Sequence, residues 1–270
     1  MDRGHVVNRR GRSLYRAFHV PRGKPRRLWV FCSALLEDAT FGWRVFVELA
    51  DAVAAAGDAA VRFDVEGQGD SEGEARALGL DDWIDDTLDA VAHARARFGE
   101  GLELVLVSLG SGSLVAAAAA ERAGADRLLL IEPVVEGGRW FDKLLKGHTT
   151  MQLSCYNRLR QTPAELAAQL DRDEPVSLLG QEVGRAFSQS LRAARLVPWL
   201  TSRARRTDII GVARAGRPGV PDEVQALASV PAVQVHTCEV AAFLDKGLRY
   251  WELPPPLAAL CLALVTEETQ

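Results

Sequence analysis

Ser108 is the residue around which the candidate chemistry of this chain is organised. It stands between an apolar run at residues 102–107 and an alanine-rich run at residues 113–120. The first run is typical of a buried strand in a parallel sheet, and the second of a helix packed tightly against it. A strand, a sharp turn and a helix form a nucleophile elbow, which holds a serine at its tip beside the free N–H groups of the helix. We therefore predict that Ser108 stands at this tip and acts as a nucleophile.

The turn departs from the G-x-S-x-G pattern of such elbows at one position. Gly110 follows Ser108 by two residues, but Leu106 stands where the first glycine is expected. A glycine at that position relieves crowding beneath the serine. A strand-to-helix turn that merely needs small residues is therefore the alternative interpretation.

The elements that would position Ser108 alternate along the chain. Strands are predicted at residues 28–32, 59–65, 126–131, 208–213 and 232–238, and helices near residues 42–56, 80–98, 221–228 and 256–266. This alternation predicts an α/β protein with a doubly wound parallel sheet, preceded by an antiparallel hairpin at the start of the chain. Residues 135–200 break the rhythm without a strand-like run, and we expect them to form a helical cap. The core would then comprise residues 1–134 and 201–270.

Composition and charge exclude several classes of protein. The chain has 270 residues, 48% of them hydrophobic and 25% charged, and a net charge of −4, so it gives no global signal for nucleic-acid binding. The basic residues among the first 27 are expected to form the solvated face of an edge hairpin, with an anion-binding surface as the alternative. No apolar run reaches the roughly 18 residues that span a bilayer.

The cysteine pattern and the lack of a leader point to one compartment. The four cysteines are far apart and form no C-x-x-C pair, so we expect neither a metal site nor a disulfide framework. The charged N-terminus lacks the apolar segment of a signal peptide, and we predict a cytoplasmic protein with reduced thiols. No cofactor is expected, because Gly110-Ser111-Gly112 does not complete the G-x-G-x-x-G pattern of dinucleotide-binding proteins.

A second motif and the order of elements together resemble the α/β-hydrolase superfamily. Residues 63–71, FDVEGQGDS, look like the D-x-x-G-x-G-x-S loop that follows the fourth strand in that superfamily. The resemblance implies an α/β-hydrolase fold with a mostly parallel sheet, an N-terminal antiparallel hairpin, an elbow after strand five and a helical cap inserted after strand six.

More narrowly, the chain is similar to the hydrolase-like proteins associated with exosortase A systems. Those proteins carry a Gly-x-Gly-Asp-Ser loop, an x-Leu-Gly turn and a Pro-Val-x-x-Gly segment, which residues 133–137 match here. The similarity implies a bacterial accessory role near exopolysaccharide or surface-protein export. Ser108 departs from that group, in which the elbow position is often not serine.

The resemblance also says where a catalytic triad would lie. A serine needs a base to take its proton and an acid to orient that base. The usual loop after the last strand holds no histidine, and the nearest is His236, for which a structural role is the alternative. Glu132, directly after strand six, is the candidate acid, with a polar strand end as the alternative.

The remaining candidate residues would form the oxyanion hole and the substrate pocket. The backbone N–H groups of Leu109 and of Ala34 or Leu35 are the expected oxyanion donors. Cys32, which precedes them, is expected to be buried packing, because no basic neighbour is visible to lower its pKa. The cap residues expected to bind substrate are Trp140, Phe141, His148 and Met151, although they could equally form the cap's own core.

Two functional hypotheses follow. The first is a serine hydrolase or acyltransferase that acts on a small ester or thioester through Ser108, His236 and Glu132. The second is a catalytically impaired or non-catalytic protein that binds a ligand or partner in its capped pocket, because the usual histidine and aspartate are missing. Since one fold hosts many functions, the site itself has to decide between them.

Overall fold

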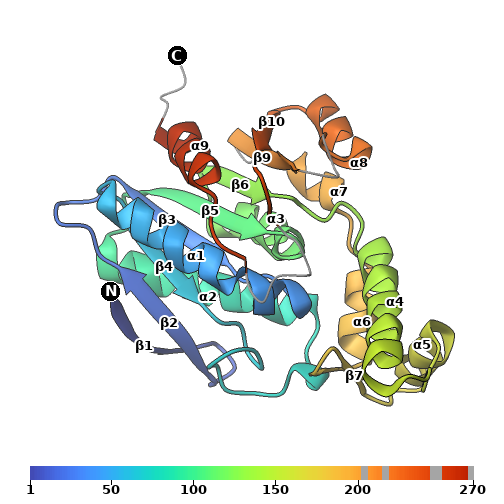
Figure 1. The fold of residues 1–270 in the computed structure, drawn as a ribbon. Coiled ribbons are helices and arrows are strands. Elements are labelled where there is room, and N and C mark those ends of the chain that lie inside the picture. The colour runs from blue at the N-terminus through green and yellow to red at the C-terminus, as the bar shows by residue number, and fades with distance from the viewer. Residues whose placement is uncertain (202–205, 215–218, 244–250, 267–270) are drawn as a thin grey trace.

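An eight-stranded sheet forms the centre of the computed structural model, which describes residues 1–201, 206–214, 219–243 and 251–266 (Figure 1). The strand order is β1-β2-β4-β3-β5-β6-β9-β10. Strand β2 pairs antiparallel with β1 and with β4, and all other pairs are parallel. The strands are β1 (Asp2–Val7), β2 (Ser13–His19), β3 (Arg27–Cys32), β4 (Ala59–Phe63), β5 (Glu103–Leu109), β6 (Arg127–Ile131), β9 (Arg206–Ala213) and β10 (Val233–Glu239). The predicted fold class is therefore confirmed.

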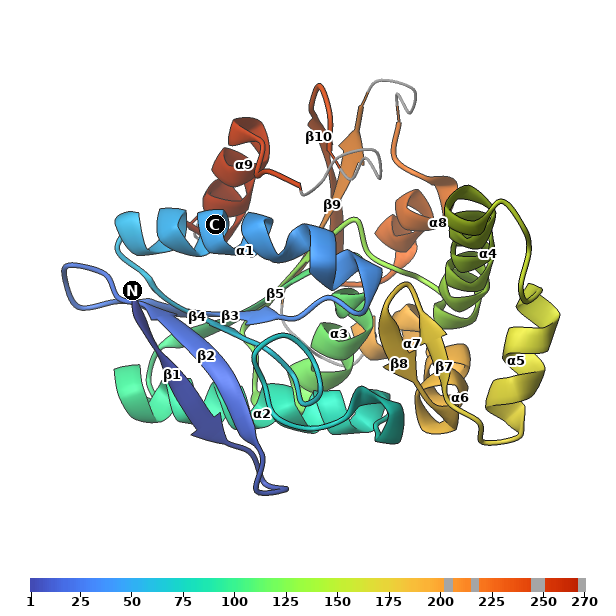
Figure 2. The same ribbon diagram turned by 60° about the horizontal axis from the view of Figure 1, so that its bottom comes forward.

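Helices cover both faces of this sheet, as a parallel sheet requires (Figures 1 and 2). Helices α1 (Glu37–Ala55) and α9 (Pro255–Thr266) pack on one face, and α2 (Leu80–Phe98) and α3 (Gly112–Ala123) pack on the other. The short helix α8 (Asp222–Gln225) and a 3₁₀ turn (Ala226–Ser229) connect β9 to β10. Among the described residues, no helix combines the length and apolar content needed to cross a bilayer.

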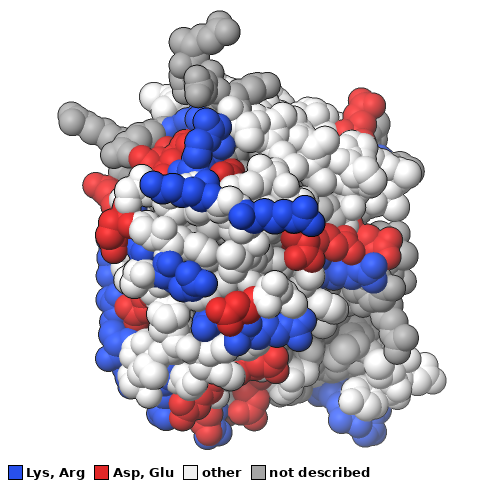
Figure 3. Space-filling view, turned by 90° about the vertical axis from the view of Figure 1, so that its left-hand side faces the viewer, with Lys and Arg blue, Asp and Glu red and all other residues white. Residues whose placement is uncertain are grey.

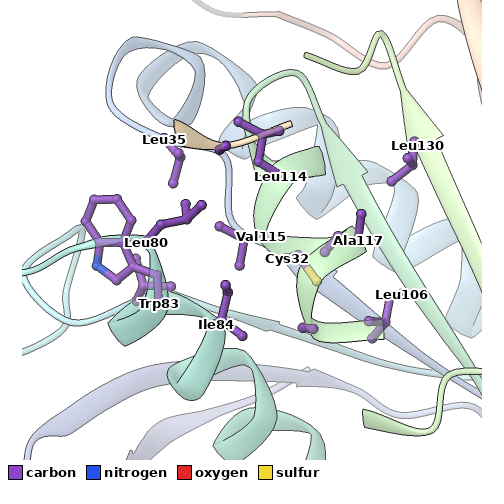
Figure 4. Close-up of a cluster of buried hydrophobic side chains, with 14 of the residues drawn as sticks. Cys32, Leu35, Leu80, Trp83, Ile84, Leu106, Leu114, Val115, Ala117 and Leu130 are labelled. Atoms are coloured by element: carbon purple, nitrogen blue, oxygen red, sulfur yellow. The ribbon is translucent and has the colours of Figure 1, made fainter. Parts of the chain in front are cut away.

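Alternation along β5 divides its side chains between two hydrophobic clusters. Leu104 and Leu106 face α2 and α3, whereas Val105 and Val107 face α1. Figure 4 shows the first cluster, in which side chains of α3 lie between those of α2 on one side and Leu106 and Leu130 of β5 and β6 on the other. Alanines at most positions of α3 let the helix lie close to the sheet.

Residues 137–200, between β6 and β9, form the segment that we call the cap. It lies to one side of the sheet (Figures 1 and 2). Its elements are α4 (Gly137–Tyr156), α5 (Pro163–Asp171), β7 (Val176–Leu178), β8 (Gln181–Val183), α6 (Arg185–Ala193) and α7 (Leu196–Leu200). The sequence predicted no strand here, but β7 and β8 form a hairpin whose turn residues Leu179 and Gly180 both have positive φ. Strands of three residues are too short to show a periodic pattern in the sequence.

Five of the nine Lys and Arg residues among the first 27 pair with carboxylates of the described chain. Arg9 pairs with Asp85 and Asp89, and Arg10 pairs with Glu66 and Asp86. On the face shown in Figure 3, positive and negative side chains are interspersed over the surface. This arrangement agrees with a solvated face rather than with an anion-binding surface.

Candidate functional site

The turn between β5 and α3 places Gly110, not Ser108, at the tip of the elbow. Gly110 has a φ of 56°, and Ser111 then caps α3. In a nucleophile elbow the nucleophile occupies this sharp strand-to-helix turn. The pattern G-x-S-x-G therefore aligns with Ser108-Leu109-Gly110-Ser111-Gly112, with serine and glycine exchanged at its first two fixed positions. The expectation that Ser108 stands at the tip is corrected accordingly.

Ser108 itself is an interior residue of β5. It lies opposite Cys32 on β3 and Leu130 on β6, and it is fully buried. Because side chains two residues apart share a face of a strand, Ser108 faces the same cluster as Leu106. Its hydroxyl has no hydrogen-bond partner among the described residues. The Ser108 side chain therefore points into the cluster between the sheet and helices α2 and α3, and not toward the turn.

His236 lies far from Ser108 and on the other face of the sheet. Strands β6 and β9 separate β10 from β5, which puts the two backbones roughly 14 Å apart at about 4.8 Å per strand. His236 shares a face with Cys238, which belongs to the cluster beneath α1 and α9. Its Nε2 lies 2.8 Å from Asp208 Oδ1. The structure therefore does not bring this expected base to the expected nucleophile.

Glu132, the expected triad acid, lies beside the elbow. It has a φ of 49°, and its Oε1 accepts a hydrogen bond of 2.6 Å from the backbone N–H of Val212. Its Oε2 lies 4.0 Å from Arg214 Nη1. Of the three expected triad residues, Glu132 is the one that lines the cavity next to Gly110.

Of the expected oxyanion donors, the N–H of Leu35 is engaged within the chain, and so is that of Ser111, which was not expected. The N–H that follows the elbow residue belongs to Ser111, and it donates to Asp38 Oδ2 at 3.0 Å. The N–H of Leu35 donates to the Ser111 hydroxyl at 3.0 Å. Leu109 lies inside β5 rather than after the tip. Sequence analysis missed Asp38 because α1 begins at Glu37, five residues earlier than expected.

Asp38 occupies the space that a nucleophilic side chain would need. A Cβ built on Gly110 would lie 2.6 Å from Asp38 Oδ2. The first turn of α1 thus brings a carboxylate to the place where an elbow serine would project. Nearby, Cys32 is fully buried, and desolvation raises the pKa of its thiol, which agrees with a packing role.

A cavity of about 300 Å³ opens beside the elbow, between the sheet and α4. Its charged side chains carry both signs. Asp38 and Glu132 lie beside the elbow, Glu136 precedes α4 and Glu223 lies on α8. Of the basic groups, Arg139 and Lys143 lie on α4 and Arg214 follows β9. Among the described residues, the Lys143 ammonium pairs with no carboxylate. The cavity is therefore built for a charged or strongly polar molecule.

The expected substrate-binding residues are divided between the cavity and the cap interior. Trp140 lines the cavity. Phe141 is fully buried and packs edge-on against Phe187. His148 Nδ1 accepts a hydrogen bond from Leu179 N within the cap, and burial lowers its pKa. Met151 does not line the cavity either, so Trp140 alone of the four lines it, and Phe141 belongs to the cap's hydrophobic core.

Two further expectations concern groups elsewhere in the chain. Among the five histidines of the sequence, none lines this cavity. The described part of the chain also holds no group of three or more His, Cys, Asp or Glu side chains that would suit a metal ion.

Comparison with known proteins places this geometry in context. A family model described as serine aminopeptidase, S33 matches residues 24–182. No curated protein sequence matches the chain.

Several solved structures share the fold at low sequence identity. Est1E from Butyrivibrio proteoclasticus with bound ferulic acid has a TM-score of 0.62 and 16% identity, over 87% of this chain and 89% of that one. An alpha-beta serine hydrolase homologue from Coxiella burnetii has a TM-score of 0.53 and 15% identity, over 88% of each chain. A deformylase of N-formylmaleamic acid from Pseudomonas putida has a TM-score of 0.52 and 15% identity, over 88% and 92%. At these identities the likeness concerns the fold alone.

Proposed function

The chain belongs to the serine aminopeptidase S33 family of α/β hydrolases, and we propose that it binds a small charged molecule in the cavity beside Gly110 without forming an acyl-enzyme. The observation that carries this proposal is the glycine at the tip of the elbow. Covalent serine catalysis needs a hydroxyl at that point with a base in hydrogen-bond reach. Gly110 has no side chain, and Asp38 fills the place of one.

The oxyanion donors support the same proposal. A tetrahedral intermediate needs N–H groups aimed at the position where its negative charge develops. Here the Ser111 N–H already donates to a carboxylate, and the Leu35 N–H donates to a hydroxyl. A negatively charged oxygen would also be repelled by Asp38. The elbow is therefore better suited to a donor or cationic group than to an oxyanion.

Charge on the cavity wall suggests the class of ligand. Asp38 and Glu132 at the elbow would receive a cationic or donating end, and Lys143 on α4 would receive an anionic end. We propose a small zwitterion, such as an amino acid or a dipeptide, as the ligand class.

A thermal-shift screen with free amino acids and dipeptides tests this proposal. A ligand that binds only the folded state raises the Tm, and the shift grows with concentration. We expect at least one such ligand, with the shift lost in Lys143→Ala and retained in Lys146→Ala, the matched lysine one turn further along α4 that does not line the cavity. A shift that survives both Lys143→Ala and Glu132→Gln would contradict this placement.

Hydrolysis of an ester or thioester through Ser108 is the second candidate, and family membership favours it. It requires the buried hydroxyl to reach a substrate and a base, neither of which its position in β5 provides. Turnover of an ester panel by wild type that disappears in Ser108→Ala would support this candidate over the first.

The resemblance to proteins associated with exosortase A systems supports a further proposal, an accessory role near exopolysaccharide or surface-protein export in a bacterium. Four residues of the Pro-Val-x-x-Gly segment that carries this resemblance, Pro133 to Glu136, line the cavity. The shared segment therefore coincides with the proposed binding site.

A further inference from the structure

Helix α4 of the cap ends in a run of exposed residues. Residues 153–160, with the sequence LSCYNRLR, comprise the last turn of α4 and the turn that follows it, and we call them the cap tip. All eight are exposed. They belong to the cap, which lies to one side of the sheet (Figure 1), and none of them lines the cavity beside Gly110. Nothing in the proposed function uses this surface.

Exposed apolar side chains are concentrated at the cap tip. Of the eight large hydrophobic side chains that are exposed in the described part of the chain, three lie here. Leu153 is 51% exposed, Tyr156 48% and Leu159 45%. Leu153 and Tyr156 are three residues apart in α4, so they lie on one side of the helix. A group of exposed apolar side chains, unlike a single one, marks a surface that another body covers.

The charged side chains in and around the cap tip are all positive. Residues 143–164 contain no Asp or Glu. The basic residues of this segment are Lys143, Lys146, Arg158 and Arg160. No carboxylate of the described chain lies within ion-pair distance of any of these four. Lys143 lines the cavity beside Gly110, which leaves three cations for the cap tip and the face of α4 that leads to it.

The carboxylates at the two ends of this segment are engaged elsewhere. Asp142 accepts a hydrogen bond of 3.1 Å from Arg192 of α6. Glu165 accepts one of 2.8 Å from the backbone N–H of Thr162, within the cap of α5. The positive charge of the segment is therefore not neutralised by its nearest acidic neighbours in the sequence.

Two contacts hold the cap tip in this arrangement. The buried Gln152 Oε1 accepts from the N–H groups of Arg160 and Gln161 at 2.8 and 3.0 Å, which ties the chain after α4 back to the helix. The Arg160 guanidinium lies 3.7 Å from the centre of the Tyr156 ring. Apolar and cationic groups are thus presented together from one fixed turn.

We propose that the cap tip docks on an anionic lipid surface, with Leu153, Tyr156 and Leu159 among the headgroups and the cations at lipid phosphates. Leucine and tyrosine side chains both suit the boundary between acyl chains and water. Basic side chains beside them gain from the negative surface potential of anionic lipids. A lipid surface adapts to an exposed helix end, whereas a protein partner would need a hollow shaped for it. The proposal is independent of the ligand beside Gly110.

Flotation with lipid vesicles tests this docking. Vesicles of phosphatidylcholine alone would be compared with vesicles that also contain phosphatidylglycerol. We expect binding to the anionic vesicles that weakens as salt is added, and far weaker binding to the neutral ones. Each basic residue near an anionic surface strengthens binding about fivefold, so Arg158→Gln with Arg160→Gln should lower the affinity roughly 25-fold. Leu153→Ser with Leu159→Ser should lower it roughly tenfold or more.

Matched controls remove similar groups from other surfaces. Arg22→Gln with Arg26→Gln takes two exposed charges from the loop between β2 and β3. Val197→Ser takes an exposed apolar side chain from α7. Both controls should bind anionic vesicles as wild type does.

Cys155 supplies an independent readout, because it is exposed in the cap tip while the other three cysteines are buried. An environment-sensitive fluorophore attached to it should shift its emission to the blue when anionic vesicles are added. Bound protein with unchanged emission would overturn the proposal, since another surface would then make the contact.

Folded wild type that does not float with anionic vesicles would also overturn it, and would leave the cap tip as a surface for another protein. The same holds for equal binding to neutral and anionic vesicles, or for equal losses in the tip variants and their controls.

Discussion

The cavity beside Gly110 and a second cavity, of about 550 Å³ between α1 and the loop after β4, differ in how the polar groups of their lining residues are satisfied. Beside Gly110, the groups that a hydrolase would present to a substrate are already bonded within the chain, since Asp38 accepts from Ser111 and Glu132 accepts from Val212. Two residues that line the second cavity, Gln68 and Gln181, each have a buried amide atom with no hydrogen-bond partner among the described residues. The comparison shows that groups at the elbow are satisfied by internal hydrogen bonds, whereas some buried amide atoms elsewhere in the described chain are not. A molecule in the cavity beside Gly110 would therefore be held by charge and hydrogen bonds, without a covalent bond to the elbow.

The largest loss of stability is expected from Gly69→Ala, which should disrupt the wall of the second cavity. Gly69 has a φ of 54°, and an added Cβ would lie 2.2 Å from Asp64 Oδ2. Backbone strain and this clash together should lower the free energy of unfolding by about 3 kcal/mol. Gly11→Ala is the matched control, because Gly11 also has a positive φ but its Cβ would meet nothing within 4 Å. Urea unfolding that shows equal losses for the two variants would contradict the packing described for the loop.

Gly110→Ala should lower the free energy of unfolding by about 2 kcal/mol, because a non-glycine residue at positive φ is strained. Its Cβ would also contact Asp38. Because the carboxylate is the obstacle, part of this loss should be recovered when Gly110→Ala is made in an Asp38→Ala background. A double-mutant cycle measured by chemical unfolding gives the coupling. Strict additivity would mean that Asp38 does not occupy the place of the missing side chain.

Two buried glutamines should respond in opposite directions when changed to leucine. Gln152 is 3% exposed, and its Oε1 accepts from the N–H groups of Arg160 and Gln161. Gln152→Leu leaves those donors unpaired and should lower the free energy of unfolding by about 2 kcal/mol. Gln68→Leu removes a buried Nε2 that has no partner among the described residues and should raise the free energy of unfolding by about 1 kcal/mol. A loss of stability in Gln68→Leu would show that its amide is bonded in the ligand-free protein.

The smallest effect concerns pH and Asp64, on the wall of the second cavity. Burial raises the pKa of this carboxyl, although the N–H of Asp70 partly opposes that shift. A raised folded-state pKa means that the group stabilises the fold most below its unfolded pKa of about 3.9, and that this contribution is lost as pH rises through the folded value. Between pH 4 and pH 7, the unfolding free energy of wild type should therefore fall relative to that of Asp64→Asn. Parallel curves over that range would contradict the burial of this carboxyl.

Much of the fold could be predicted from the sequence because its signals are local. Apolar runs bounded by turn residues located the strands, and the glycines of residues 63–71 located the loop after β4. The position of Ser108 could not be fixed in the same way, since Ser-Leu-Gly-Ser-Gly fits an elbow with either Ser108 or Gly110 at its tip. The backbone conformation decides between them. The sequence does not distinguish Gly110, with its positive φ, from an ordinary turn glycine.

The long-range features of the sites could not be predicted from the sequence, for a different reason. His236 was paired with Ser108 by its order along the chain, but strand order and facing direction, which separate the two, depend on the whole sheet. The second cavity is assembled from segments more than a hundred residues apart, Gln68 and Gln181 among them. No single segment carries a pattern that would have indicated it.

Treatment with a fluorophosphonate probe, followed by intact-mass measurement, tests the central claim most directly. Wild type, Ser108→Ala and a known serine esterase would be treated side by side. We predict that the esterase gains one adduct while neither form of this protein gains any, because no activated serine stands at the elbow. A single adduct on wild type that is absent from Ser108→Ala would contradict the account, and would show that Ser108 reaches solvent and a base.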